Sequence, residues 1–553
     1  MKFTGLFLLI VLLGFTACHS DNNKPEEEQQ DAAGGIRIAW DYSSMQQIAQ
    51  RGGYGRLKRM QDNSLIAVYE TLTGNIDLRR SYDNGATWSA PVKMFWQFTY
   101  KGKNGKSTPV NMSNAEITQL KNGDIIVGAN YRPQKAEIAP FSIAIRRSTD
   151  NGATWLEPQI LYNAAPRFHD GCWEPSFLQL PDGELQVYFA NENPYQQSDE
   201  QEISVMSSKD NGITWEDART VCFRKGRRDG MPVATIVGDE IVMVIEDNNI
   251  DRFKPYTVRT KLADNWPKPV LADSPDREYA LTEKINDTVY MGAPYLLKLP
   301  TGETLISYQT NENRASDWEY STMEVAVGDK EARNFGRRTR PFDVPLNKEA
   351  KWNSLALWDK NTVVALAASN FKSKFIAPWL IKGYIIPGLK IATKDITGYP
   401  LFIGAKGETN LRAGLGKDEE NLYVKCMVND NSLYGLKESG TASDGVFVYF
   451  SNGKKTLRLW CSYQGKFDVW DKIGKDWQIR SAANVQASSS LSDKGYDLEI
   501  IIPAKDIPEA DNGTIWVSMA LSAYDDAQAG YTEMLVNSEE DKPETWLRVK
   551  LDN

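Results

Sequence analysis

Histidine and cysteine are scarce in this chain, which has two His and five Cys among 553 residues. The cysteines show no C-x-x-C spacing, so a structural metal site is not expected. Lysine and arginine form no basic stripe, and the net charge of −9 is mildly acidic, which argues against a nucleic-acid partner. Beyond the first twenty residues no apolar run is long enough to span a membrane. We therefore expect no cofactor, no metal and no nucleic acid.

The single long apolar run lies at the N-terminus. Lys2 precedes residues 6–15, which are too short for a membrane span and typical of a secretory signal. The segment ends in TAC at residues 16–18, which resembles a bacterial lipobox and implies cleavage before Cys18 and its lipidation. Residues 19–35 then form a polar tether. We expect an outer-membrane lipoprotein, at the cell surface or on the periplasmic face; the alternative is an ordinary signal peptide with a chance cysteine.

An octapeptide of the form S-x-D-N-G-x-T-W occurs three times, at residues 81–88, 148–155 and 208–215. In such a turn Ser and Asp side chains bond the backbone, Asn-Gly permits positive φ, and Thr-Trp begins a strand with a packing aromatic ring. Recurrence after 67 and then 60 residues indicates a repeat architecture. The octapeptide resembles the Asp-box of sialidases and their relatives, which implies a six-bladed β-propeller.

Six short turns place the rest of this region on the same register. Each separates a first apolar strand from a second, nearly continuous apolar strand, as expected for strands buried on both faces. The turns are residues 62–64, 122–124, 182–184, 238–240, 301–303 and 359–361. Later repeats lack the full octapeptide, although DNW at 264–266 is a worn copy. The sequence predicts an all-β chain with a six-bladed β-propeller over residues 36–389.

The strand pattern changes from about residue 390. SDGVFVYF at 443–450 and GYDLEIIIP at 495–503 resemble family 9 carbohydrate-binding modules, which implies a β-sandwich over residues 390–553. Further strand-like segments are residues 413–428 and 457–460.

In such modules exposed tryptophans clamp sugars, and Trp460, Trp470 and Trp477 are the candidates here. The alternative is that these side chains pack in the core or at its rim. Cys426 and Cys461 lie in the same domain and are either paired or buried thiols.

The chemistry of a propeller is expected at its axial funnel. Residues at the ends of the second strands, which should face it, are Glu70, Asn130, Ala190, Glu246, Gln309 and Ala367. For Glu70 alone, a polar residue that marks the strand end is the simpler interpretation. The third blade opens with RFHDGCWEPS at 167–176, which places Glu174 on the inner strand. Cleavage of a glycosidic bond needs two carboxyl groups, and Glu174 and Glu246 are the predicted catalytic pair.

Several segments together resemble glycoside hydrolase family 93. They are WEP at 173–175, YFANENPY at 188–195, RDGMP at 228–232, IED at 245–247, GAPY at 292–295 and SYQT at 307–310. The resemblance implies a retaining exo-α-1,5-L-arabinanase that releases arabinobiose, with the family carboxylates at Glu174 and Glu246. We assign Glu246 as nucleophile and Glu174 as acid/base, because Trp173 and Pro175 give Glu174 a drier setting that raises a carboxyl pKa, although neighbouring cations would oppose this.

Other side chains near the expected funnel are predicted to contact the substrate, an oligosaccharide or polysaccharide. They are Arg56, His169, Asp170, Arg228, Asp229, Tyr295 and Gln309.

An exo-α-sialidase is the main alternative function. Sialidases hold the substrate carboxylate with three arginines, the first in an Arg-Ile-Pro motif, whereas YGRLK stands at 54–58 here. Arg132, Arg167 and Arg228 supply further charges without a sialidase-like context. A second alternative is a surface glycan-binding lipoprotein without catalysis.

Overall fold

The structure is a computed structural model that describes residues 35–551 except 104, 392, 406–407, 436–440, 482–483 and 526–528. The leader and Cys18 lie outside these residues. The described regular structure consists of β-strands and short 3-10 helices, which confirms the all-β class. The 3-10 helices are η1 (Phe168–Asp170), η2 (Asn193–Tyr195), η3 (Trp318–Tyr320), η4 (Ala504–Asp506) and η5 (Pro543–Thr545). Among these residues no helix is long and apolar enough to cross a membrane.

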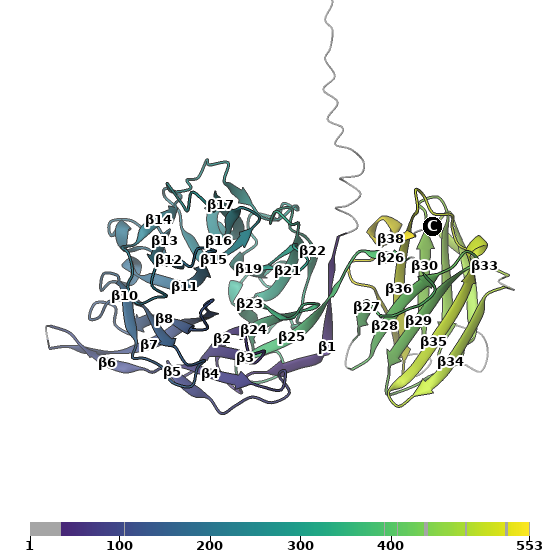
Figure 1. Cartoon of the computed structure of the whole chain (residues 1–553), viewed down its shortest axis with the longest axis horizontal. Coiled ribbons are helices and arrows are strands. Elements are labelled where there is room, and N and C mark those ends of the chain that lie inside the picture. Colours follow the sequence, from purple (N-terminus) through teal and green to yellow (C-terminus); the bar gives the residue numbers. More distant parts are fainter. Residues whose placement is uncertain are drawn as a thin grey trace, which may run out of the picture.

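Residues 37–386 form six antiparallel sheets within the described part of the chain, called here the six-sheet domain (Figure 1). Sheet 1 contains β2 (Gly53–Arg59), β3 (Leu65–Glu70), β4 (Ile76–Ser81) and β5 (Val92–Phe95). Sheet 2 contains β6 (Phe98–Lys101), β7 (Ser107–Gln119), β8 (Ile125–Pro133), β9 (Ser142–Ser148) and β10 (Gln159–Asn163). Sheet 3 contains β11 (Cys172–Gln179), β12 (Leu185–Asn191), β13 (Glu202–Ser208) and β14 (Arg219–Cys222).

The remaining three sheets follow the same plan. Sheet 4 contains β15 (Asp229–Val237), β16 (Glu240–Ile250), β17 (Arg252–Lys261) and β18 (Arg277–Tyr279). Sheet 5 contains β19 (Met291–Lys298), β20 (Thr304–Thr310), β21 (Thr322–Gly328) and β22 (Gly336–Thr339). Sheet 6 contains β23 (Ala350–Asp359), β24 (Thr362–Ser369), β25 (Ala377–Ile386) and, from the start of the domain, β1 (Arg37–Gln47).

One strand of each sheet contacts the equivalent strands of the two neighbouring sheets. These six strands, called here the first strands, form a closed ring, and the strand paired with each one after the predicted turn is called the second strand. The ring runs β2, β7, β11, β15, β19, β23 and back to β2. Strand pairing also closes the domain, because β1 from its N-terminal end pairs with β25 from its C-terminal end in sheet 6. Each predicted turn joins the first and second strand of one sheet, and second strands such as β12 are buried along their whole length.

The octapeptide turns have the hydrogen bonds expected from their residues. In the first copy Thr87 N donates to Asp83 Oδ1 at 2.9 Å, and Gly85 N donates to Ser81 Oγ at 2.8 Å. Asn84 has a φ of 56°, in the left-handed region. The hydroxyl and N–H of Thr87 and the hydroxyl of Ser81 all donate to the exposed Asp83 carboxylate and lower its pKa to about 2. The three copies begin at the last residues of β4, β9 and β13, so the same turn ends equivalent strands of sheets 1 to 3.

Residues 389–551 form a second unit of two packed sheets, called the two-sheet domain. One sheet has the order β26-β38-β36-β30-β31-β32-β33, with β37 on β36, and the other β27-β28-β29-β35-β34. The strands are β26 (Leu389–Ile391), β27 (Leu401–Gly404), β28 (Asn410–Lys417), β29 (Asn421–Asn429), β30 (Gly445–Ser451), β31 (Thr456–Ser462), β32 (Phe467–Ile473), β33 (Asp476–Arg480), β34 (Gln486–Ser492), β35 (Gly495–Pro503), β36 (Thr514–Tyr524), β37 (Gly530–Met534) and β38 (Leu547–Leu551). The segment 413–428 is therefore a hairpin, and Cys426 and Cys461 are free buried thiols.

The two domains contact each other directly, in addition to being joined by the chain. Figure 1 shows β1 on the side of the six-sheet domain that faces the two-sheet domain, and β1 contacts β27. The buried Arg37 donates to the carbonyl oxygens of Val536 at 2.9 Å and Thr545 at 2.7 Å. Ala39 and Ile386 belong to the same buried apolar cluster as the two-sheet core.

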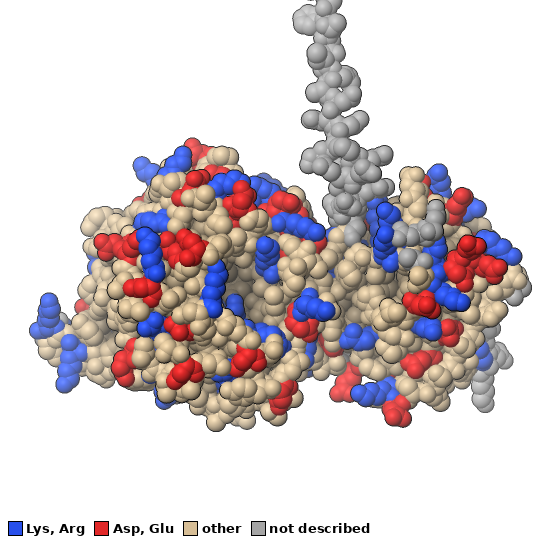
Figure 2. All heavy atoms as spheres, viewed as in Figure 1, with Lys and Arg blue, Asp and Glu red and all other residues tan. Residues whose placement is uncertain are grey.

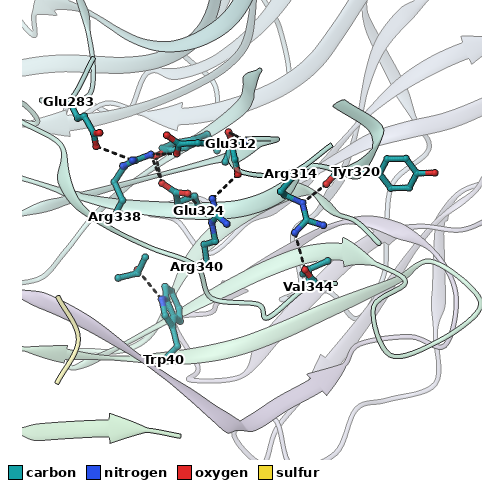
Figure 3. A network of polar contacts seen from close by, with 12 residues as sticks. Trp40, Glu283, Glu312, Arg314, Tyr320, Glu324, Arg338, Arg340 and Val344 are labelled. Carbon is teal, nitrogen blue, oxygen red and sulfur yellow. Dashed lines mark hydrogen bonds and ion pairs between the residues drawn. The ribbon is translucent and has the colours of Figure 1, made fainter. Parts of the chain in front are cut away.

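An ion-pair network braces the outer edge of sheet 5 next to this junction. Arg338 bonds the carboxylates of Glu283 at 2.9 Å, Glu312 at 2.5 Å and Glu324 at 2.9 Å (Figure 3). Trp40 on β1 donates to Thr339 Oγ1 at 3.0 Å. On the face drawn in Figure 2, acidic and basic side chains are interspersed over both domains.

Candidate active site

Every first strand of the six-sheet domain contains the same backbone irregularity. One residue adopts a left-handed conformation, with φ between 48° and 53°, where the pairing with the second strand shifts register. These six residues are Tyr54, Asn114, Glu174, Met231, Ala293 and Trp352. Left-handed geometry at a non-glycine residue often marks a functional site. Here six equivalent positions share it, so it belongs to the fold and is not specific to Glu174.

Side chains near the ends of the second strands accept hydrogen bonds from the irregular turns of the neighbouring sheet. Glu246 Oε2 accepts from Ala293 N at 2.7 Å, and Gln309 Oε1 accepts from Trp352 N at 2.7 Å. The residues opposite the paired first-strand positions are Glu70, Asn130, Ala190, Glu246, Gln309 and Ala368. The sixth position is therefore Ala368, one residue beyond the predicted Ala367, because β24 extends to Ser369.

Glu246 is half-buried at the ring and closely packed. A Cβ atom at Gly292 would lie 2.6 Å from Glu246 Oε2, and one at Gly230 would lie 2.9 Å from Oε1, so a side chain at either position would displace the Glu246 carboxylate. Burial raises the pKa of Glu246 to about 7, while the Ala293 N–H and the charge of Arg228 act in the opposite direction.

Glu174, on the adjacent sheet, is the second carboxyl of the pair. Burial and the charge of Glu246 raise its pKa to about 8, and Arg132 and the backbone N–H of Met231 oppose this rise. The interaction with Glu246 shows that the fold brings the two predicted catalytic carboxyls together. Two carboxyls with raised pKa values, from groups 72 residues apart in sequence, are a typical feature of an acid/base site.

Three arginines act on the carboxyl groups Glu70, Glu174 and Glu246 at the ring, and two of these arginines form ion pairs. Arg56 is buried, pairs with Glu116 at 3.3 Å, and lies over the ring of Tyr295 at 5.3 Å. Arg228 pairs with the buried Glu192. The third, Arg132, is half-buried and lies over the ring of Trp173.

Several residues predicted to contact substrate are instead supporting residues. The Asp229 carboxylate is fully buried and bonds Arg277 at 2.6 Å and 2.9 Å, so its assignment as a substrate ligand is corrected. Asp170 is buried and pairs with Arg167 at 2.9 Å. Gln309 is buried between Trp352 and Tyr290.

Two of the predicted contacts lie at accessible positions. His169 is exposed on η1, where its ring contacts Phe168, which in turn packs on Trp173. Arg228 keeps 29% of its side chain exposed while it holds Glu192.

Other residues of the site could not be assigned from the sequence. The Tyr290 hydroxyl accepts from Gln309 Nε2 at 3.0 Å and interacts electrostatically with both Glu246 and Glu174. Tyr54 packs with Met231 and Ala293 in an apolar cluster at the ring, against Trp352. No repeated motif marked these aromatic residues; only their alignment on the register of the first strands would have identified them.

A cavity of about 760 Å³ lies toward the other end of the ring's axis from the carboxyl pair. It is lined by residues of all six first strands that follow the irregular turns, among them Lys58, Glu116 and Tyr295. The paired Arg56 and Glu116 thus lie between the carboxyl pair and this cavity.

The tryptophans of the two-sheet domain divide into buried and accessible ones. Trp460 is buried, so for this side chain the core interpretation holds. Trp470 and Trp477 are half-buried, and the guanidinium of Arg458 lies 4.7 Å and 4.6 Å from their ring centres.

Comparison with known proteins agrees with this division into two domains. The family model described as a BNR repeat-like domain matches residues 57–280 and 139–316, and the one described as carbohydrate family 9 binding domain-like matches 405–549. Comparison with curated proteins found no match.

Solved structures similar to the chain include enzymes and a binding module. The family 93 α-L-arabinofuranosidase of Fusarium graminearum, in complex with arabinobiose, has 15% identity and a TM-score of 0.45, covering 64% of this chain and 97% of that one. The NanB sialidase of Streptococcus pneumoniae has 12% identity and a TM-score of 0.43, covering 62% and 70%. A family 9 module of Caldicellulosiruptor kristjanssonii, with cellotriose, has 15% identity and a TM-score of 0.25, covering 30% and 93%.

Proposed function

We propose that this protein is a retaining glycoside hydrolase whose six sheets are the blades of a propeller. The observation that carries the proposal is the carboxyl pair at the ring, where Glu174 has a pKa of about 8 and Glu246 one of about 7. Such a pair can hold one proton between two acids at neutral pH, as double-displacement hydrolysis requires. The match to a BNR repeat-like domain supports the same class of enzyme.

The lower pKa of Glu246 supports its role as nucleophile and that of Glu174 as acid/base. Glu246, the more acidic group, attacks the anomeric carbon as a carboxylate while Glu174 donates its proton to the leaving oxygen. Glu174, now ionised, then takes a proton from the water that attacks the glycosyl–Glu246 ester, and Glu246 leaves as a carboxylate. Each carboxyl ends the cycle in its starting protonation state.

The charges around the site favour a neutral sugar over a sialoside. Arg56 and Arg228 are paired with Glu116 and Glu192, so they cannot form a cationic clamp without losing those partners. Three further carboxyl groups, those of Glu70, Glu174 and Glu246, face the same region. A substrate carboxylate would be repelled by the ionised Glu246, whereas neutral hydroxyl groups would find acceptors. We infer an exo-acting α-L-arabinanase that takes arabinan, anchored to the outer membrane by a lipid on Cys18.

The two-sheet domain would keep the enzyme on its polysaccharide. Its half-buried Trp470 and Trp477, beside the guanidinium of Arg458, are the aromatic candidates for sugar contact, and its family match supports carbohydrate binding.

Product analysis tests the proposal. The full-length protein is incubated with debranched arabinan and, in parallel, with sialyllactose, and the products are separated by chromatography. Release of arabinobiose with retained configuration is expected from arabinan, and no product from sialyllactose. Release of sialic acid alone would establish the alternative activity. Binding of arabinan without any product would make the chain a glycan-binding protein.

A further inference from the structure

Glu70 and Glu246 accept the same kind of backbone hydrogen bond in two sheets of the ring. Glu70 ends β3 opposite Gly53, as Glu246 lies on β16 opposite Gly230. One Glu70 oxygen, Oε1, accepts from Asn114 N at 2.5 Å, just as one Glu246 oxygen accepts from Ala293 N. Sheets 1 and 4 are three steps apart in a ring of six, so the two carboxyls lie across the axis from each other.

This hydrogen bond from the irregular turn does not require a carboxylate. In sheet 5 the neutral amide of Gln309 accepts from Trp352 N at 2.7 Å and holds the irregular turn equally well. In sheet 2 the Asn130 amide, at the same position, bonds Cys172 O at 2.6 Å. A carboxylate at the half-buried Glu70 has a desolvation cost that a glutamine would avoid. The fold therefore does not explain why position 70 carries an ionisable group.

Arg132 is close enough to act on both Glu70 and Glu174, and it has unused donors. Its charge acts on both carboxyl groups, and its guanidinium stands 5.0 Å from the ring centre of Trp173. Among the described residues no side-chain hydrogen bond or ion pair of Arg132 is found, in contrast to Arg56 and Arg228. Within the same residues Glu70 bonds through Oε1 alone, which leaves Oε2 as an acceptor.

We propose that Glu70 and Arg132 bind hydroxyl groups of the sugar held at the carboxyl pair, which makes Glu70 a specificity-determining residue across the axis from Glu246. A free carboxylate acceptor beside a planar donor with unused N–H groups can bond neighbouring sugar hydroxyls. The inference rests on the proposed function, because it needs a glycoside bound at the carboxyl pair.

Binding to an inactive variant tests the inference separately from catalysis. The dissociation constant of arabinotriose is measured by calorimetry for Glu174→Gln and for Glu174→Gln combined with Glu70→Gln. We expect weaker binding by on the order of tenfold or more when Glu70 is replaced, with an unchanged melting temperature, because the amide keeps the bond to Asn114. Glu216→Gln, an exposed carboxylate on sheet 3, is the matched control and should leave binding unchanged.

Two further variants separate recognition from folding. Glu70→Ala removes the bond to Asn114 as well and should lower the melting temperature, whereas Glu70→Gln should not. Arg132→Gln should weaken binding by a similar factor, and its effect should be smaller when Glu70 is already replaced, since the two side chains bind the same sugar.

The possible outcomes are distinguishable. If arabinan is cleaved and Glu70→Gln binds arabinotriose as tightly as its parent, the role of Glu70 is wrong and the proposed function stands. If Glu70→Gln loses binding only together with its fold, Glu70 is a structural residue and the inference is wrong. If the wild type neither cleaves nor binds arabino-oligosaccharides, both proposals fail.

Discussion

The charge of Glu246 raises the pKa of Glu174 across the boundary between sheets 3 and 4. Glu174 comes from the irregular turn of a first strand, and Glu246 from a second strand, so the interaction depends on the register of both sheets. The coupling makes the protonation state of one carboxyl depend on the other, as acid/base exchange requires.

Replacing either carboxyl should abolish turnover without unfolding the protein. Glu174→Gln and Glu246→Gln are expected to lower the rate on arabinan on the order of 10²-fold or more, because each removes a group that acts in the transition state. The amide introduced by Glu246→Gln can still accept from Ala293 N, as Gln309 does from Trp352, so the melting temperature should stay close to that of the wild type. Rates and circular dichroism melting curves check both statements, with Asp182→Asn as a control for loss of an exposed carboxylate.

Added azide should distinguish the two roles. It is expected to restore cleavage in Glu246→Gln, because a small anion can attack the anomeric carbon in place of the nucleophile. In Glu174→Gln it should not restore cleavage of substrates whose leaving group needs a proton. Rescue of the Glu174 variant in place of the Glu246 variant would reverse the assignment.

The pH dependence of kcat/KM should be a narrow bell. Activity needs Glu246 ionised and Glu174 protonated, so it rises as pH passes about 7 and falls above about 8. In Glu246→Gln the like charge is gone, and the pKa of Glu174 should fall. The alkaline limb of the azide-rescued reaction should therefore move to lower pH. An unchanged alkaline limb would mean that Glu246 does not act on the titration of Glu174.

Cys18 should determine where the mature protein resides. Cys18→Ala is expected to give soluble protein or an unprocessed precursor, because a lipobox without its cysteine cannot be lipidated. Membrane fractionation followed by mass spectrometry of the N-terminus measures this. Membrane association equal to that of the wild type would exclude a lipid anchor at this residue.

Arg37 should stabilise the full chain only while the two-sheet domain is present. Arg37→Met is expected to cost about 1.5–3 kcal/mol of unfolding free energy in the full chain, because the carbonyls of Val536 and Thr545 lose a buried charged donor. In a chain that ends at Leu389 the same change should have little effect. That shorter chain should fold and cleave short oligosaccharides.

Denaturant unfolding of the four proteins checks this prediction. Equal destabilisation by Arg37→Met in the long and short chains would show that Arg37 acts within the six-sheet domain. Failure of the short chain to fold would show that the cluster around Ala39 and Ile386 belongs to a core shared by both domains.

Much of the fold could be predicted because its signals are local. The three octapeptides carry their own hydrogen-bonding groups within a few residues, and the turns between first and second strands do the same. Alternation of these turns with apolar strands was enough to place Glu246 and Gln309 at equivalent ends of strands. The expected position Ala367 was one residue short, because nothing in an alanine-rich strand marks its end.

The sequence by itself determined the repeat, the strand register and the residue types at the strand ends. Only the tertiary structure decided which charges remain available: Arg56 is neutralised by Glu116 and Asp229 by Arg277, through pairs 60 and 48 residues apart. It also decided that β1 closes sheet 6 and that Tyr290 stands beside the carboxyl pair. Turn geometry depends on neighbouring residues, whereas burial, desolvation and ion pairing depend on which distant strands pack together.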